Sequence, residues 1–229
     1  MKPEFVPLAP DARRLPLRRG DMLNAYLLGD VLVDAGVRAG ARKVLRALEG
    51  ERVAAHAITH GHFDHQGASH ALCQALGIPL WCGAGEKEAV ESGDFTRLLP
   101  KPRSLAARVE QLLSGPAHPV ARVLRQGDEV GAGFVVLETP GHTAGSISFW
   151  READGVLVLG DAAMSRHPWT GRRGLQEPVG LGTLDRELNR ASLRRLAELR
   201  PAIVCFGHGE PLAEPMRFRA FVAGLSLPD

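Results

Sequence analysis

The chain has 229 residues, 45% of them apolar, and a formal net charge of +2. This length and apolar content are enough for a substantial core, and we expect residues 1–229 to form a single domain. The weak net charge provides no strong field, which argues against nucleic acid or an anionic membrane surface as a partner.

Short apolar runs and turn signals predict alternating strands and helices in the first half. MLNAYLL and VLVD, separated by Gly29-Asp30, indicate a hairpin with a tight turn. The buried-strand pattern VAAHAI runs directly into the polar, glycine-bearing segment THGHFDHQG. The elements expected here are strands at 22–28, 31–34, 53–58 and 80–82, helices at 39–48, 68–76 and from 86, and an amphipathic, proline-punctuated segment at 94–118.

The second half repeats this pattern. Strands are expected at 134–138, 146–150, 156–159 and 202–206, and helices at 184–199 and about 215–225. Residues 162–182 are rich in glycine and arginine and are expected to form a long loop. Two halves of this kind suggest two packed sheets with helices outside.

Metal-binding side chains gather just after the predicted strands. Loops at strand ends are where a rigid scaffold presents functional groups, and neighbouring glycines let the backbone turn sharply and approach a ligand. The residues at such positions are His60, His62, Asp64, His65, His142, Asp161 and His208.

The segment HGHFDH places four of these side chains within six residues. Imidazole nitrogen and carboxylate oxygen both bind divalent metals, but four such groups cannot easily reach one tetrahedral ion. Alternate positions of an extended segment point the same way, so His60 and His62 can bind one ion. Asp64 and His65 lie at the bend toward the next helix and can bind a second ion. Without a metal, these four groups would crowd charge and desolvate polar atoms.

Three later residues complete this arrangement. His142 follows Pro140-Gly141 and would complete the first site. His208 lies between two glycines and would complete the second. Asp161 has two oxygens and no competing carboxylate at its strand end, so it is the natural bridge between the ions.

The segments HGHFDH, PGHTAGS, LGD and FGHGEP, in this order, resemble the motif series of the metallo-β-lactamase superfamily. The resemblance implies an α+β fold, the αββα sandwich of two mixed β-sheets flanked by helices. It implies two divalent metal ions, with zinc as the first expectation and iron or manganese as alternatives. It implies that His60, His62 and His142 bind one ion, that Asp64, His65 and His208 bind the other, and that Asp161 bridges them.

The activity expected from this resemblance is hydrolysis of a small-molecule ester, thioester or lactone by a hydroxide that bridges two metal ions. Ions about 3.5–4 Å apart lower the pKa of a shared water toward neutrality. Asp64 would orient the hydroxide and pass its proton to the leaving group, and Asp161 would hold both ions in register, so both are catalytic candidates. Thr59, Thr143 and Ser146 are placed to fix imidazole tautomers.

Two alternatives stay open. The first is a mononuclear iron dioxygenase resembling the persulfide dioxygenases, with one iron held by His60, His142 and Asp161. The second is a non-catalytic metal-binding domain, which a missing ligand would have favoured. The glyoxalase II branch is disfavoured because only about twenty residues follow His208, and the acyl-homoserine lactonase branch because the single tyrosine, Tyr26, lies in the early hairpin.

The loop SRHPWTGRRGL follows the strand that ends at Asp161. We expect it to line the substrate cleft, with its arginines binding an anionic group, while a solvated basic loop is the alternative. The substrate-contact candidates are Arg166, His167, Trp169, Arg172 and Arg173. His56 and His70 are expected to be packing or surface residues, and His118 to face solvent.

Cysteine usage and hydropathy indicate the compartment. Three cysteines without a CxxC pair predict buried thiols in a reducing environment. The first twenty residues lack the apolar region of a signal peptide, and no stretch approaches 18 uninterrupted apolar residues. We therefore expect a cytoplasmic protein with no membrane partner. Its oligomeric state stays open, with a homodimer through the terminal helix as one option.

Overall fold

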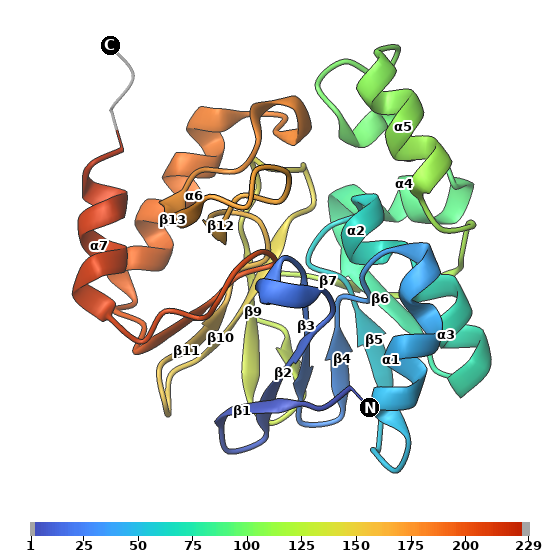
Figure 1. The fold of residues 1–229 in the computed structure, drawn as a ribbon, viewed down its shortest axis with the longest axis horizontal. Coiled ribbons are helices and arrows are strands. Elements are labelled where there is room, and N and C mark those ends of the chain that lie inside the picture. The colour runs from blue at the N-terminus through green and yellow to red at the C-terminus, as the bar shows by residue number, and fades with distance from the viewer. Residues whose placement is uncertain (1–2, 226–229) are drawn as a thin grey trace.

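Two β-sheets pack face to face in the computed structural model, which describes residues 3–225 (Figure 1). The first sheet has seven strands in chain order: β1 (Val6–Ala9), β2 (Ala12–Pro16), β3 (Asn24–Leu28), β4 (Val31–Val33), β5 (Ala55–Ala57), β6 (Leu80–Gly83) and β7 (Val120–Leu124). The second has the order β14 (Ile203–Cys205), β11 (Val156–Val158), β10 (Ile147–Arg151), β9 (Phe134–Glu138) and β8 (Glu129–Val130). A separate hairpin joins β12 (Met164–Arg166) to β13 (Arg173–Gln176).

Helices cover both outer faces of this pair of sheets. The α-helices are α1 (Ala41–Leu48), α2 (Phe63–Gln66), α3 (Ser69–Leu76), α4 (Lys87–Ser92), α5 (Leu105–Leu113), α6 (Arg186–Glu198) and α7 (Pro215–Ala223). Short 3-10 turns are η1 (Arg19–Asp21), η2 (Arg38–Gly40), η3 (Ala84–Glu86), η4 (Phe95–Leu98) and η5 (Gly180–Gly182). Within residues 3–225, no helix combines the length and the apolar character needed to cross a membrane.

Apolar side chains point alternately to the two faces of each strand, so each sheet has a separate core on either side. On β3, Tyr26 and Leu28 face the core between the sheets, whereas Ala25 faces α1. Successive strand residues point to opposite faces, so one strand serves both layers. The second sheet does the same, since Val156 and Val158 pack between the sheets and Leu157 packs beneath α6 and α7. The expected α+β sandwich of two mixed sheets flanked by helices is confirmed.

Several elements were not expected from the sequence. The hairpin β1–β2 contains Pro7 and Pro16, which obscure its strand pattern, but proline is tolerated on an edge strand and at a strand end. Residues 162–182 were expected to be a loop but contain the β12–β13 hairpin. In the ambiguous segment 94–118, Ser104 starts α5, because its Oγ accepts a hydrogen bond from the Ala107 amide at 3.2 Å.

Strand direction brings the candidate site together. Strands β4, β5 and β6 run parallel to one another, and β11 runs parallel to β14. Strand β9 has the same direction as β11, because each pairs antiparallel with β10. The carboxyl ends of parallel strands meet at one edge, so the residues that follow these strands gather at one end of the sandwich.

Candidate metal centre

The seven predicted metal ligands lie together at this end of the sandwich. The side chains form three overlapping sets, each with one ligand atom per residue and all such atoms within 4.8 Å of one another. These sets are His60, His62 and His142; His60, His65 and Asp161; and Asp64, His65 and His208. The middle set shares a residue with each of the others, so the cluster is continuous.

His60, His62 and His142 face one another from loops on the two sheets. His60 and His62 follow β5, and His142 follows β9. The Nε2 atom of His142 lies 3.0 Å from Nδ1 of His62. Its other nitrogen lies 3.2 Å from the Thr183 hydroxyl. The His60 Nδ1 lies 3.1 Å from the Thr59 hydroxyl, which leaves its Nε2 facing the cluster.

The orientation of His65 comes from Asp34, which follows β4. The His65 Nδ1 donates to Asp34 Oδ2 at 2.8 Å, so its Nε2 is free to act as a ligand. That Nε2 lies 3.4 Å from Asp161 Oδ1. Asp34 also accepts a hydrogen bond from the Thr59 amide at 2.7 Å. One buried carboxylate therefore orients the first ligand loop and one of its histidines.

His208 is positioned by residues of the N-terminal segment. Its Nδ1 donates to the Met22 carbonyl at 2.6 Å, and its Nε2 lies 3.3 Å from Asp64 Oδ2 and 3.1 Å from Asp161 Oδ2. The Asn24 side chain donates to the carbonyls of Phe206 and Gly209, on either side of this histidine. The N-terminal segment thus fixes the last loop of the cluster.

Three buried ligand atoms that face the cluster form no hydrogen bond with any described residue: His60 Nε2, His65 Nε2 and Asp161 Oδ1. A buried polar atom without a partner costs about 1–3 kcal/mol. Three such atoms that converge from two loops are what a bound divalent cation would satisfy, because imidazole nitrogen and carboxylate oxygen are its usual ligands. The residues present therefore fit a metal centre.

Burial keeps three of the histidines neutral, whereas neighbouring carboxylates keep His208 protonated in the metal-free protein. Burial lowers the pKa of His60 and His62 and brings that of His142 to about 3, so these rings are neutral, as coordination requires. Burial also disfavours charge on His208, but Asp161 and Asp64 outweigh it and raise the pKa of His208 to about 10. The same pairing holds the pKa of Asp64 at about 2 against its burial. Metal binding would displace the His208 proton.

Glu86 joins the two ligand loops of the first set. Its fully buried carboxylate accepts from the Gly61 amide at 2.7 Å through Oε2 and from the Gly145 amide at 2.9 Å through Oε1. A side chain at Gly145 would place its Cβ 2.5 Å from the Glu86 backbone nitrogen, so this approach requires glycine. Sequence reasoning missed Glu86 and Asp34, although both share the signal of the ligands, since each follows a strand end.

Of the residues predicted to fix tautomers, Thr59 contacts His60 as described. Thr143 and Ser146 instead bond to each other, with their hydroxyl oxygens 2.8 Å apart. Tyr26 lies in the core, where its hydroxyl donates to the Phe206 carbonyl at 2.7 Å. The tyrosine is thus fully engaged away from the cluster, as expected from its place in the hairpin.

The other histidines have packing or surface contacts. Buried His56 has both nitrogens engaged, near the Leu32 carbonyl and the Ser69 hydroxyl. His118 was expected to face solvent but is half-buried, with its Nδ1 3.3 Å from Nδ1 of His70. None of these three joins a ligand set among the described residues.

A cavity of about 870 Å³ opens over the cluster, and His62, Asp64, His142, Asp161 and His208 form part of its lining. Trp169, one of the substrate-contact candidates, also lines it. Among the described lining residues, none of the other four substrate-contact candidates is present: Arg166, His167, Arg172 and Arg173.

The hairpin explains where these four side chains go. Arg166 donates to the Gly20 carbonyl at 2.7 Å, and Arg172 donates to Gln176 Oε1 at 3.0 Å. Arg173 lies 3.9 Å from Glu210, and the His167 Nδ1 accepts from the Trp169 amide at 3.2 Å. Around the paired strands β12 and β13, these basic groups therefore contact the Gln176 side chain, the backbone of their own loop and neighbouring loops.

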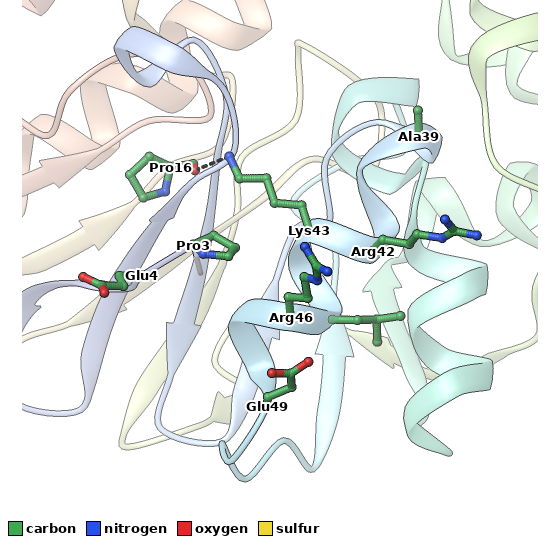
Figure 2. Close-up of a pocket in the computed structure, with 9 residues that line it drawn as sticks. Pro3, Glu4, Pro16, Ala39, Arg42, Lys43, Arg46 and Glu49 are labelled. Carbon is green, nitrogen blue, oxygen red and sulfur yellow. Dashed lines mark hydrogen bonds between the residues drawn. The ribbon is translucent and has the colours of Figure 1, made fainter. Parts of the chain in front are cut away.

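A second hollow, of about 930 Å³, lies between the N-terminal segment and α1 (Figure 2). Arg42, Lys43 and Arg46 of α1 line it together with Glu4 and Glu49, and Figure 2 shows Lys43 reaching toward Pro16. The Lys43 ammonium donates to the Pro16 and Leu17 carbonyls, at 3.0 and 2.6 Å. Among its described lining residues there is no metal-ligand candidate and no buried polar atom without a partner, so we assign no site there.

Comparison with known proteins places this geometry in context. The family model of the metallo-beta-lactamase superfamily matches residues 18–208. The probable metallo-hydrolase YflN of Bacillus subtilis is 30% identical over 200 residues, which cover 80% of this chain and 76% of that protein.

Two solved structures share the architecture. The metallo-beta-lactamase family protein TTHA1429 from Thermus thermophilus superposes with a TM-score of 0.69 at 26% identity, covering 95% of this chain and 80% of that one. TTHA1623, solved in a di-iron-bound form, superposes with a TM-score of 0.60 at 30% identity, covering 91% and 93%.

Proposed function

The chain belongs to the metallo-beta-lactamase superfamily, and from this premise we propose that it is a hydrolase that uses two divalent metal ions to cleave a small-molecule ester, thioester or lactone. The observation that carries the proposal is the convergence of three buried ligand atoms without hydrogen-bond partners, His60 Nε2, His65 Nε2 and Asp161 Oδ1, in a cluster over which a cavity opens. The name of YflN as a probable metallo-hydrolase supports the reaction class.

The proposed ligands divide between two ions. His60, His62 and His142 would hold the first, and Asp64, His65 and His208 the second, in agreement with two of the compact sets. Asp161 would serve both ions, since it forms a set with His60 and His65 and its other oxygen faces His208.

When bound, the ions would supply Lewis acidity for the substrate carbonyl and for a water nucleophile. The chain itself would supply orientation and proton transfer. Asp64 lines the cavity, and its ionised carboxylate can accept a proton from the attacking water and return it to the leaving group. Asp34 and the Met22 carbonyl keep the ligand nitrogens of His65 and His208 directed inward, which limits reorganisation during the reaction.

The number of converging residues favours two ions over one. A single iron held by His60, His142 and Asp161 would leave His62 Nδ1, which faces His142, and the buried Nε2 of His65 without a metal. The di-iron form of TTHA1623, a relative with 30% identity, supports two ions and makes iron a serious alternative to zinc.

The test is elemental analysis of the purified protein by mass spectrometry, followed by assays on esters, thioesters and lactones. We expect about two zinc, manganese or iron ions per chain and hydrolysis of at least one substrate class. One iron per chain with oxygen uptake on persulfides would replace this proposal with the dioxygenase. Metal binding without turnover of any substrate would favour a non-catalytic domain, and no metal after reconstitution would overturn the metal centre.

A further inference from the structure

The cavity over the metal centre has two apolar walls. One consists of α5 and the loop before it, and includes Leu99, Leu105 and Val109. The other consists of the β12–β13 hairpin and the segment before α6, and includes Trp169 and Leu181. Figure 1 shows α5 and the segment before α6 on opposite sides of the upper end of the sheets. The two walls therefore come from segments far apart in the chain.

The walls of this cavity offer little positive charge to an anionic ligand. Among its described lining residues, Lys101 is the single lysine or arginine. Asp64, Glu110 and Asp161 place carboxyl groups on its floor, and Glu110 is held there by accepting from the Phe63 amide at 2.6 Å. The proposed metal ions would offset the charges of Asp64 and Asp161, so a negative group carried away from the metal centre along the walls would have Lys101 as its single cationic partner among these lining residues.

The mouth of the cavity exposes large apolar side chains. Leu105 is 76% exposed, Trp169 67% and Leu181 62%. Exposed apolar side chains of this kind, beside a cavity that reaches polar ligands, are typical of a binding site. A hydrocarbon group that extends outward from the metal centre would cover these three side chains.

We propose that this cavity binds an uncharged hydrocarbon acyl chain attached to the scissile carbonyl, so that the substrates are apolar acyl esters, thioesters or lactones. The proposal rests on the proposed hydrolase function for the reaction but not for the binding. The carbonyl would lie over Asp64 and Asp161, and the chain would run between Val109 and Leu181 toward the mouth.

Binding can be measured without turnover. N-methyl alkanamides from butyramide to decanamide would be titrated calorimetrically into the metal-free and the zinc-loaded protein. We expect affinity to rise about threefold to fourfold per methylene until the cavity is filled. Val109→Asn places an amide in the wall and should remove most of this increase. Leu112→Asn is the matched control, because Leu112 lies on the same helix and is 78% exposed but does not line this cavity.

Hydrolysis of p-nitrophenyl esters from acetate to decanoate by the zinc-loaded protein supplies the second measurement. We expect kcat/KM to rise with chain length, and Val109→Asn to lower the octanoate-to-acetate ratio at least about tenfold while Leu112→Asn keeps it. Hydrolysis with no dependence on chain length would overturn the acyl-chain proposal and leave the hydrolase standing. Chain-dependent binding without hydrolysis would uphold the apolar site and overturn the hydrolase. Neither signal, with a dimer in light scattering, would assign the apolar mouth to a second copy of the chain and overturn the proposal.

Discussion

The floor and the walls of the cavity are built in opposite ways. The floor is polar and buried, and its residues follow strand ends and have partners such as Asp34, Glu86 and the Met22 carbonyl. The walls are apolar and partly exposed, and they come from a short helix, a hairpin and the 3-10 turn η5. The difference indicates that the scaffold fixes the reaction chemistry, whereas substrate choice depends on side chains whose replacement costs the sandwich little.

The largest effect is expected on the floor. His62→Ala should lower kcat by about a thousandfold or more, because several kcal/mol of transition-state stabilisation depend on an intact metal site. Metal content should fall, while circular dichroism and the melting temperature should change little, since the sandwich core does not include this loop. His70→Ala, on the half-buried surface of α3, is the matched control. Complete unfolding of His62→Ala would show that the metals are structural.

A smaller effect is expected for Glu86, which holds together two ligand loops of the cavity floor. Glu86→Ala leaves the Gly61 and Gly145 amides without their acceptor, so both ligand loops should loosen. We expect metal affinity, measured by competition with a chelator, to fall about 10-fold to 100-fold. Glu88→Ala is the control, because this exposed carboxylate lies close by in the chain and pairs with Arg97. Equal affinities for the two variants would contradict a bracing role for Glu86.

Glu110 lies where floor and wall meet and should make stability depend on pH. Burial, reinforced by the charge of Asp64, raises its pKa from 4.5 to about 8. Between these values the folded metal-free protein holds a proton on Glu110 that the unfolded chain releases. Its contribution to the free energy of unfolding is therefore present at low pH and is lost as pH rises through this window.

Glu110→Gln should remove this loss. Urea unfolding of the metal-free proteins at pH 5 and pH 8 should show a decrease for the parent that exceeds that of the variant by a few kcal/mol, as an order of magnitude. The ion pairs around His208 are present in both proteins, so the difference isolates Glu110. Parallel pH profiles would contradict a raised pKa.

The smallest effect is expected outside the cavity. Arg172→Ala and Arg173→Ala should leave KM for anionic and neutral esters within about twofold, because neither side chain lines the cavity. A large rise in KM for anionic esters alone would instead support the basic cleft expected from the sequence.

The sequence predicts the floor far better than the walls. The ligands of HGHFDH are close in sequence, and each of the others follows a recognisable strand, so spacing was enough to group them. The partner of His65 is less visible, because Asp34 lies 31 residues away. The walls combine Val109, Trp169 and Leu181, whose proximity depends entirely on tertiary packing. Arg172 lies outside the cavity because β12 pairs with β13. The glycines and arginines of this segment hid that pairing in the sequence.

The contact between Met22 and His208 also determines the order in which the two proposed metal sites can form during synthesis. Met22 and His208 are separated by 186 positions, so the Nδ1 contact forms only after nearly the whole chain has left the ribosome. The three histidines of the other proposed site are complete by residue 142. A nascent chain could therefore capture one ion before it could assemble the second site, and full loading would report that the segments around Met22 and His208 had come together.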